Sequence, residues 1–164
     1  FPTRRSSDLW VKGAKLVELK ECNTEEDPVR PELDNKFRTG YGRKIYGVEY
    51  KGEIYAVMCF AYTNQIPKSV DELEKLSTDA FLQSAMRDQS GGQIAIAYTV
   101  WSKKKGGGKL IVKEVFKKIK KSNHLNRLIT LSPLTEMATK FHTKNGAKLL
   151  QINETTQNFE YKVL

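Results

Sequence analysis

The sequence predicts a single α/β domain, and three observations support this class. Short apolar segments of strand length alternate with segments whose apolar residues recur at helical spacing. Two strand-like segments, Lys44–Tyr50 and Glu53–Tyr62, are separated only by Lys51-Gly52, which is typical of a hairpin with a two-residue turn. The apolar segment Ile94–Trp101 leads through a glycine-rich turn into an amphipathic helix over Leu110–Lys121. The order of these segments indicates α/β without specifying a topology.

Several further elements are expected before the glycine-rich turn. Leu16–Cys22 alternates weakly and reads as a first strand, and the polar segment that follows is expected to contain a short helix around Glu32–Phe37. A turn at Gly40–Gly42 precedes the hairpin, and Asn64–Ser69 is expected to be a loop. Two helical pieces are then predicted over Val70–Ser77 and Thr78–Asp88, with inward-facing Leu73, Leu76, Phe81, Leu82 and Met86. The whole stretch Asn64–Gly92 is either a substrate lid or ordinary helical cover over one sheet face.

Three elements are expected after the Leu110–Lys121 helix. Leu128–Leu131 reads as a short buried strand. Pro133 is expected to start the next helix with Ser132 as its cap, and Asn145-Gly146 to end it. The segments Lys148–Asn153 and Asn158–Val163 read as a closing hairpin.

The first nine residues, Phe1–Leu9, are expected to be a non-native leader ahead of the domain 10–164. They read as the translation of a common sequencing-adapter oligonucleotide, and the chain has no initiating Met. The net charge of the whole chain is +9, and removing the two arginines and one aspartate of this leader leaves +8. A basic protein of this kind favours anionic partners.

The rest of the composition indicates a soluble globular protein. No apolar run approaches the length of a membrane span, so no membrane partner is expected. The two cysteines, Cys22 and Cys59, form neither a disulfide framework nor a metal-ligand pattern, so no metal is expected. The predicted location is the cytoplasm with both thiols reduced, and Cys59 is expected to be a buried apolar residue.

The run Trp101–Lys109 combines four lysines with three consecutive glycines between a strand and a helix. Glycines let the backbone approach an anion closely, and the helix N-terminus adds partial positive charge. A nucleotide-binding P-loop is excluded because position 103 is Lys and Lys109 is followed by Leu110. A dinucleotide-binding fingerprint fails because its third glycine is missing. The turn therefore predicts a phosphate site of another kind, or a solvated basic turn that binds nothing.

The spacing Lys103, Gly106, Gly108 resembles the acetyl-CoA pyrophosphate turn of the GCN5-related N-acetyltransferase (GNAT) superfamily. A second segment, Thr135–Ala147, resembles the later helix of that superfamily, with the form Asn-x-x-Ala-x-x-Leu-Tyr-x-x-x-Gly-Phe. The matching residues are Ala138, Phe141 and Gly146. The departures are Thr135 for the Asn, His142 for the Tyr and Ala147 for the Phe.

The resemblance implies a fold and an acyl-CoA site. It implies a mixed, mostly antiparallel sheet flanked by helices, with a V-shaped split after the strand that feeds the turn. The backbone N–H groups of Gly106, Gly107, Gly108 and Lys109 would bind the CoA pyrophosphate, with Lys103 and Lys105 as counter-charges. The backbone of Thr99, Val100 and Trp101 would pair with pantetheine. The implied reaction is direct acetyl transfer from acetyl-CoA, as co-substrate, to an unidentified amine.

The catalytic residues implied by the resemblance are less certain than its CoA site. His142 stands where the superfamily usually has the Tyr that protonates the departing thiolate, and it is either that donor or a packed helix residue. Tyr98 and Glu154 are candidates for the general base by position only, and each is equally read as structural.

Two alternatives to a small-molecule N-acyltransferase stay open. The basic residues of the Leu110–Lys121 helix suit a nucleic-acid acceptor, or simply form its solvated face; they are Lys113, Lys117, Lys118, Lys120 and Lys121. The departures in the second motif also suit a module that binds CoA without turnover.

Overall fold

The computed structural model describes residues 13–86 and 91–163, and the expected leader Phe1–Leu9 lies outside them. The strands are β1 (Lys15–Leu19), β2 (Lys44–Tyr50), β3 (Glu53–Thr63), β4 (Ile94–Ser102), β5 (Arg127–Thr130), β6 (Ser132–Pro133), β7 (Lys148–Ile152) and β8 (Thr156–Tyr161). The helices are the 3₁₀ turn η1 (Thr24–Glu26) and the α-helices α2 (Asn35–Thr39), α3 (Val70–Met86), α4 (Gly107–Lys121) and α5 (Glu136–Lys144).

The strands form one mixed sheet in the order β1-β2-β3-β4-β5-β8-β6, with β7 also paired to β8. Every pairing is antiparallel except that of β4 with β5. The predicted mostly antiparallel α/β sheet is therefore confirmed. The β2–β3 hairpin turns through Lys51 (φ 52°) and Gly52 (φ 77°), the left-handed pair that a two-residue turn of this kind requires.

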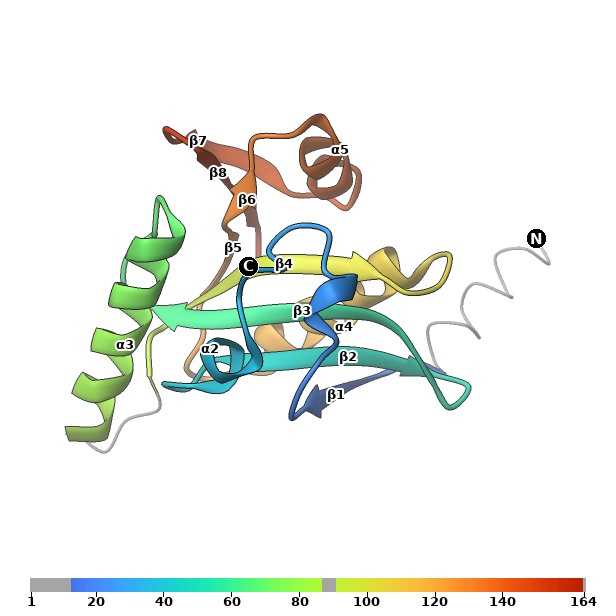
Figure 1. Cartoon of the computed structure of the whole chain (residues 1–164), viewed down its shortest axis with the longest axis horizontal. Coiled ribbons are helices and arrows are strands. Elements are labelled where there is room, and N and C mark those ends of the chain that lie inside the picture. The colour runs from blue at the N-terminus through green and yellow to red at the C-terminus, as the bar shows by residue number, and fades with distance from the viewer. Residues whose placement is uncertain (1–12, 87–90, 164) are drawn as a thin grey trace.

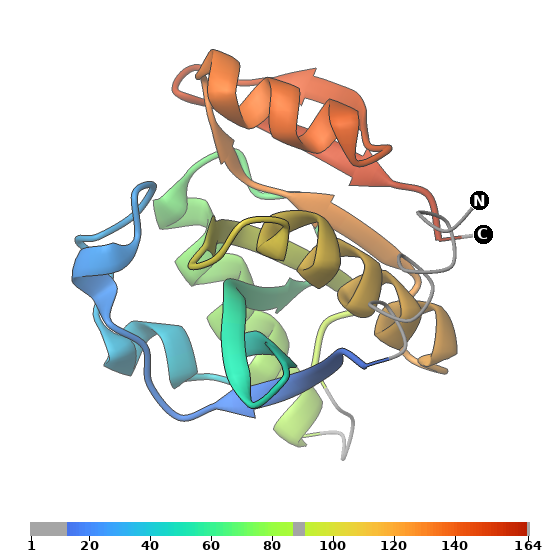
Figure 2. The same ribbon diagram turned by 90° about the vertical axis from the view of Figure 1, so that its right-hand side faces the viewer.

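The sheet has two apolar faces because side chains alternate along its central strands. One face carries residues of β2, β3 and β4 that pack against α4; they include Tyr46, Val48, Ala56, Met58, Phe60, Ala95 and Ala97. The other face packs against α2 and α3 and includes Ile45, Val57, Cys59, Ala61 and Ile96. Figures 1 and 2 show α4 on the opposite side of the sheet from α2, with α5, β7 and β8 gathered at one end.

The split in the sheet begins where β4 leaves β5. The two strands pair in parallel only from Ile94–Ala97 against Arg127–Thr130. A bulge in the β3–β4 ladder makes Cys59 oppose Thr99 while Phe60 opposes Ala97, so Tyr98 is the extra residue. In the described part of the chain, no strand pairs with the outer edge of β4 beyond Ala97. The predicted V-shaped opening therefore lies along residues 98–102.

Two predictions about the helices are wrong. Val70–Met86 is one continuous helix rather than two pieces, and its buried face is formed by Leu73, Ser77, Ala80 and Ser84. Phe81 and Leu82, predicted to point inward, are 38% and 48% exposed, because small residues at the helical repeat bring α3 closer to the sheet on another side.

The expected start of α5 is also wrong. Ser132 and Pro133 form β6, and the cap is Thr135, whose side chain accepts a hydrogen bond from the N–H of Ala138. Ser132 pairs with β8 and its hydroxyl donates to Thr130, so tertiary pairing overrides the local capping preference. The predicted end at Asn145-Gly146 is confirmed, with Gly146 at φ 99°.

No helix in residues 13–86 and 91–163 combines the length and apolarity needed to cross a bilayer.

Candidate functional site

A cleft of about 700 Å³ lies in the split between β4 and β5, under α5. One wall is the free edge of β4, the floor is closed by Leu131 and Ser132, and the other wall is the first two turns of α5. The lining is mostly apolar and includes Pro28, Val29, Ala97, Val100, Trp101, Met137, Ala138 and Phe141. A concave apolar site with a few polar groups is what a small-molecule ligand needs.

The glycine-rich turn closes one end of this cleft. Gly106 adopts the left-handed conformation (φ 83°) as the N-cap of α4. The N–H of Gly107 donates to the Lys104 carbonyl (2.9 Å), and that of Gly108 donates to the Ser102 hydroxyl (2.7 Å). No acceptor among the described residues takes the N–H of Lys105, Gly106 or Lys109. These three donors, at the start of a helix, are the ones that remain for an anion.

The three glycines of the turn have different physical roles. A Cβ at Gly107 would lie 2.0 Å from the Tyr55 carbonyl oxygen, so this glycine lets α4 pack directly onto β3. A Cβ at Gly108 would meet the Phe141 ring at 2.6 Å, at the mouth of the cleft. The expectation that the Gly107 and Gly108 N–H groups bind phosphate is therefore corrected, because both groups are already bonded within the turn.

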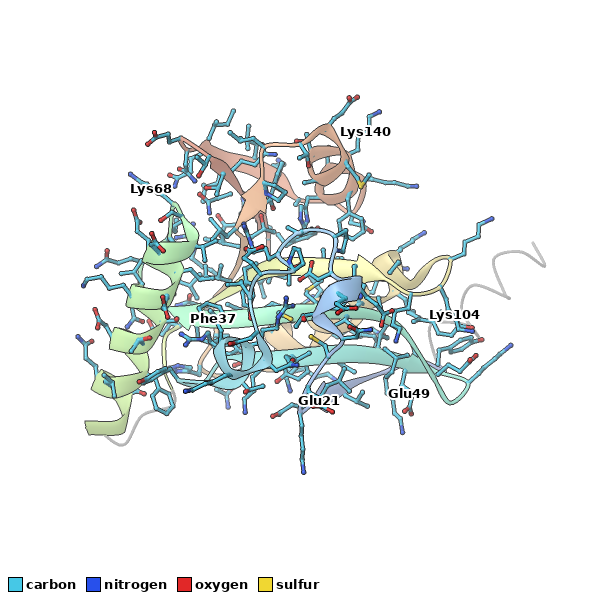
Figure 3. All side chains as sticks on the ribbon, in the orientation of Figure 1. Glu21, Phe37, Glu49, Lys68, Lys104 and Lys140 are labelled. Carbon is cyan, nitrogen blue, oxygen red and sulfur yellow. The ribbon has the colours of Figure 1, made fainter. Side chains whose placement is uncertain are left out.

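The lysines of the turn also divide into two groups. Lys103 approaches Glu26 (3.8 Å) and Lys104 pairs with Glu53 (3.0 Å). Figure 3 shows Lys104 at the end of the sheet where β4 leads into α4. Lys105 and Lys109 are exposed and make no ion pair within the described residues, so their charge is available to a ligand.

Arg30 bridges the two strands at the point where they diverge. Its Nε donates to the Tyr98 carbonyl (2.9 Å) and its Nη2 donates to the Leu131 carbonyl (3.0 Å). Both carbonyls lost a strand partner when β4 and β5 separated, and Arg30 satisfies them. The sequence analysis missed Arg30, because nothing in the local pattern shows that a residue of the η1–α2 segment reaches the split.

A buried ion pair fixes the segment that carries Arg30. Asp27 accepts hydrogen bonds from the N–H groups of Val29 and Arg30, from the Thr99 hydroxyl (2.7 Å) and from Arg38 (2.9 Å). The side chains of Asp27 and Arg38 are both fully buried. Thr99 therefore anchors β4 to this network through its side chain, while the β4 backbone borders the cleft.

His142 lines the cleft from α5 and is 6% exposed. Its Nδ1 lies 2.8 Å from the Tyr161 hydroxyl, and its ring packs beside Phe141 and Phe159. Burial among these rings lowers the pKa of His142 to about 4, so the imidazole is neutral at neutral pH. Its position in the cleft fits the resemblance, whereas the neutral ring argues against a protonated donor in the free protein.

The comparisons with known proteins decide the fold. No family model and no curated protein matches the sequence. A GNAT-like decarboxylase, GphF, solved in complex with isobutyryl-CoA, matches with a TM-score of 0.64 at 10% identity, over 92% of this chain and 100% of that chain. A Bacillus subtilis acetyltransferase solved with CoA matches with a TM-score of 0.58 at 12% identity, over 92% and 99%. The chain has the GNAT fold.

The GNAT fold also occurs as part of longer proteins. The malonyl-CoA decarboxylase of Agrobacterium vitis matches with a TM-score of 0.56 at 13% identity over 83% of this chain. The present chain spans only 38% of the length of that protein. These likenesses describe the arrangement of helices and strands.

Two of the candidate residues lie with their side chains away from the cleft opening of this GNAT fold. Tyr98 is 1% exposed, and its ring packs edge-on against Phe37 in the core. Burial raises the pKa of Tyr98, so a role as general base is not supported. Glu154 is exposed in the β7–β8 turn and does not line the cleft. The stretch Asn64–Gly92 provides helical cover through α3 rather than a lid over the cleft.

The lysines proposed for nucleic acid lie on the outer side of the GNAT-fold helix α4. Lys113, Lys120 and Lys121 are exposed there, whereas Lys117 pairs with Glu114 and Lys118 lies over the Tyr46 ring. A nucleic-acid partner stays a prediction.

The neutral, buried His142 predicts a loss of stability in mild acid. The unfolded ring binds a proton below about pH 6.5, and the folded ring resists protonation down to about pH 4. The folded pKa is depressed, so the contribution is complete above pH 6.5 and is lost as the pH falls toward 4. Between pH 7 and 5 we expect His142 to cost about 2 kcal/mol of unfolding free energy, measured by urea denaturation.

The matched variants are His142→Phe and His124→Asn, which change the only two histidines. His142→Phe should flatten the decline between pH 7 and 5, although its stability at pH 7 falls because Tyr161 loses its partner. His124→Asn should keep the decline. An unchanged slope in His142→Phe would show that the buried ring is not its source.

Proposed function

We propose that the protein is an acyl-CoA-dependent N-acyltransferase. The observation that carries this proposal is the split between β4 and β5, which opens directly beside the unsatisfied N–H groups at the start of α4. The CoA pyrophosphate is placed on the N–H groups of Lys105, Gly106 and Lys109, and pantetheine along the free edge of β4. The CoA complexes of similar fold support this placement.

The acceptor amine is placed in a second cavity of about 460 Å³, which shares Glu26 and Trp101 with the cleft. Glu21 also lines it, so two carboxylates face the space. Carboxylates attract the ammonium form of an amine and hold it near the shared wall. This second chamber supports a transfer between two substrates, because a one-substrate reaction does not need it.

In the proposed reaction the amine nitrogen attacks the thioester carbonyl carbon. A C–N bond forms, the C–S bond breaks, and the CoA thiolate leaves as the amine loses a proton. His142 lies at the cleft wall near α5, where the departing thiolate would need a proton. We assign His142 as the group that hydrogen-bonds the sulfur, and water as the source of the proton, because the ring itself is neutral.

Charge reversal at the turn tests the CoA site. Lys105→Glu should weaken CoA binding about tenfold, because exposed charges near a ligand contribute up to about 1 kcal/mol each and a reversal counts twice. Lys120→Glu, an equal charge change at the far end of α4, should leave affinity within about twofold. The measurement is calorimetric titration of CoA at low and high salt. Equal effects of both variants would indicate a general field rather than a site at the turn.

A second candidate is decarboxylation of a malonyl-type thioester, the activity named for two similar structures. The favouring observation is that Glu26, at the rim, is the only carboxylate among the residues that line the cleft. Apolar walls destabilise a substrate carboxylate, and its loss as CO₂ leaves an electron pair on the thioester enolate that a proton then quenches.

The two candidates differ in their products. N-acyl transfer releases free CoA thiol from acetyl-CoA only when an amine is present. Decarboxylation converts malonyl-CoA into acetyl-CoA and CO₂ without releasing thiol. A pooled amine screen with thiol detection, run beside malonyl-CoA with mass detection, separates them. Turnover of malonyl-CoA alone would replace the transferase proposal.

A further inference from the structure

The only two cysteines of the chain lie together in the fold. Leu19 at the end of β1 pairs with Ile45, and Ile45 pairs with Cys59 in β3, so the segment after β1 passes beside Cys59. Cys22 follows on that segment, and its thiol shares a hydrogen bond with the Cys59 thiol. Two residues far apart in the sequence thus form one dithiol.

The two thiols differ in access and in charge. Cys22 is partly exposed and lines the cavity of about 460 Å³, whereas Cys59 is fully buried. The hydrogen bond from Cys59 lowers the pKa of Cys22 and keeps the proton on Cys59. The guanidinium of Arg38 lies 3.5 Å from the Cys59 sulfur and favours negative charge on the pair. Cys22 is therefore the accessible thiol with thiolate character.

Asn35 holds Cys22 in this position. Its amide oxygen accepts from the Cys22 N–H (2.9 Å) and its amide nitrogen donates to the Cys22 carbonyl (3.0 Å). The Cys22 thiol also lies 3.5 Å from the same amide oxygen. This clamp fixes a non-strand segment over β3 and keeps the two sulfurs in contact.

We propose that Cys22 and Cys59 form an oxidisable dithiol, in which Cys22 reacts with a peroxide and Cys59 resolves the product. The Cys22 thiolate attacks one peroxide oxygen, the O–O bond breaks, and Cys22 becomes a sulfenic acid as hydroxide leaves. The Cys59 sulfur then attacks the Cys22 sulfur, an S–S bond forms, and water leaves. In sum, two thiols and hydrogen peroxide give one disulfide and two waters.

This inference goes beyond the proposed acyl transfer and does not depend on it. The disulfide would tie the segment after β1 to the centre of β3. It would also withdraw the Cys59 thiol from Arg38, which holds Asp27 and, through it, Thr99 of β4. Oxidation would thereby act on the wall shared by the two cavities.

The test uses the full chain and a small excess of hydrogen peroxide under native conditions. Intact-protein mass should show the loss of two hydrogens in a monomer, and a digest should contain Cys22 linked to Cys59. Cys59→Ala should instead gain one oxygen at Cys22, trapped by dimedone. In Cys22→Ala the buried Cys59 should stay reduced. A wild-type protein that gains oxygen or forms a linked dimer would overturn the proposal.

A second measurement avoids dependence on the variants folding. Brief alkylation of the wild type with N-ethylmaleimide should label Cys22 at least tenfold faster than Cys59, and urea should remove the difference. Equal labelling rates in the folded protein would also overturn the proposal, because Cys22 would then have no privileged access.

Discussion

Arg38→Met is expected to lower the free energy of unfolding by about 3–5 kcal/mol, because it leaves the buried Asp27 carboxylate without its counter-charge. Arg38 also donates to the carbonyls of Leu33 and Arg30, so the substitution orphans further buried acceptors. The measurement is chemical denaturation at neutral pH. Near-complete unfolding of the variant at 25 °C would agree with this expectation.

The matched control is Arg127→Met. Arg127 also forms a short, two-pronged pair, with Glu160 at 2.8 Å, but its side chain is 39% exposed. Its loss should cost no more than about 1 kcal/mol, because water replaces the partner. If both variants lost equal stability, burial would not be what makes the Asp27–Arg38 pair important.

Gly107→Ala is the second substitution with a large expected effect. In an ordinary exposed helix, Gly→Ala stabilises by up to about 1 kcal/mol. Here the added Cβ meets the Tyr55 carbonyl oxygen at 2.0 Å, and backbone atoms of a central strand cannot move aside. We expect α4 to be displaced from β3 and the unfolding free energy to fall by about 3 kcal/mol or more.

Gly108→Ala serves as the comparison for this effect. Its Cβ meets the edge of the Phe141 ring, which lies at the cleft mouth and can rotate. The cost should therefore stay near about 1 kcal/mol. A Gly107→Ala protein as stable as the wild type would show that α4 does not pack on β3 as described.

The strands were predictable because their signals are local. The β2–β3 hairpin combines period-two alternation with Lys51-Gly52, and tertiary packing only extends it. The helix α3 was harder, because its inward face uses Ser77, Ala80 and Ser84, which no hydrophobic pattern reveals. Similarly, Ser132 looked like a cap only as long as its pairing with β8 was unknown.

The candidate site was predictable in place but not in detail. The strand, glycine turn and helix indicated where an anion would bind, and the resemblance brought His142 to the same cleft. The sequence could not show that the Gly107 and Gly108 N–H groups are spent within the turn. Nor could it reveal Arg30 at the split, because that contact joins residues distant in the chain.

The central claim is that CoA binds in the cleft between β4 and β5, and a steric plug tests it. Ala138 lines the cleft from α5, whereas Thr143 is exposed on the same helix and does not line it. Calorimetric titration of CoA should show one site in the wild type and in Thr143→Trp, and no binding in Ala138→Trp. No heat with wild type, or equal affinity in Ala138→Trp, would contradict the claim.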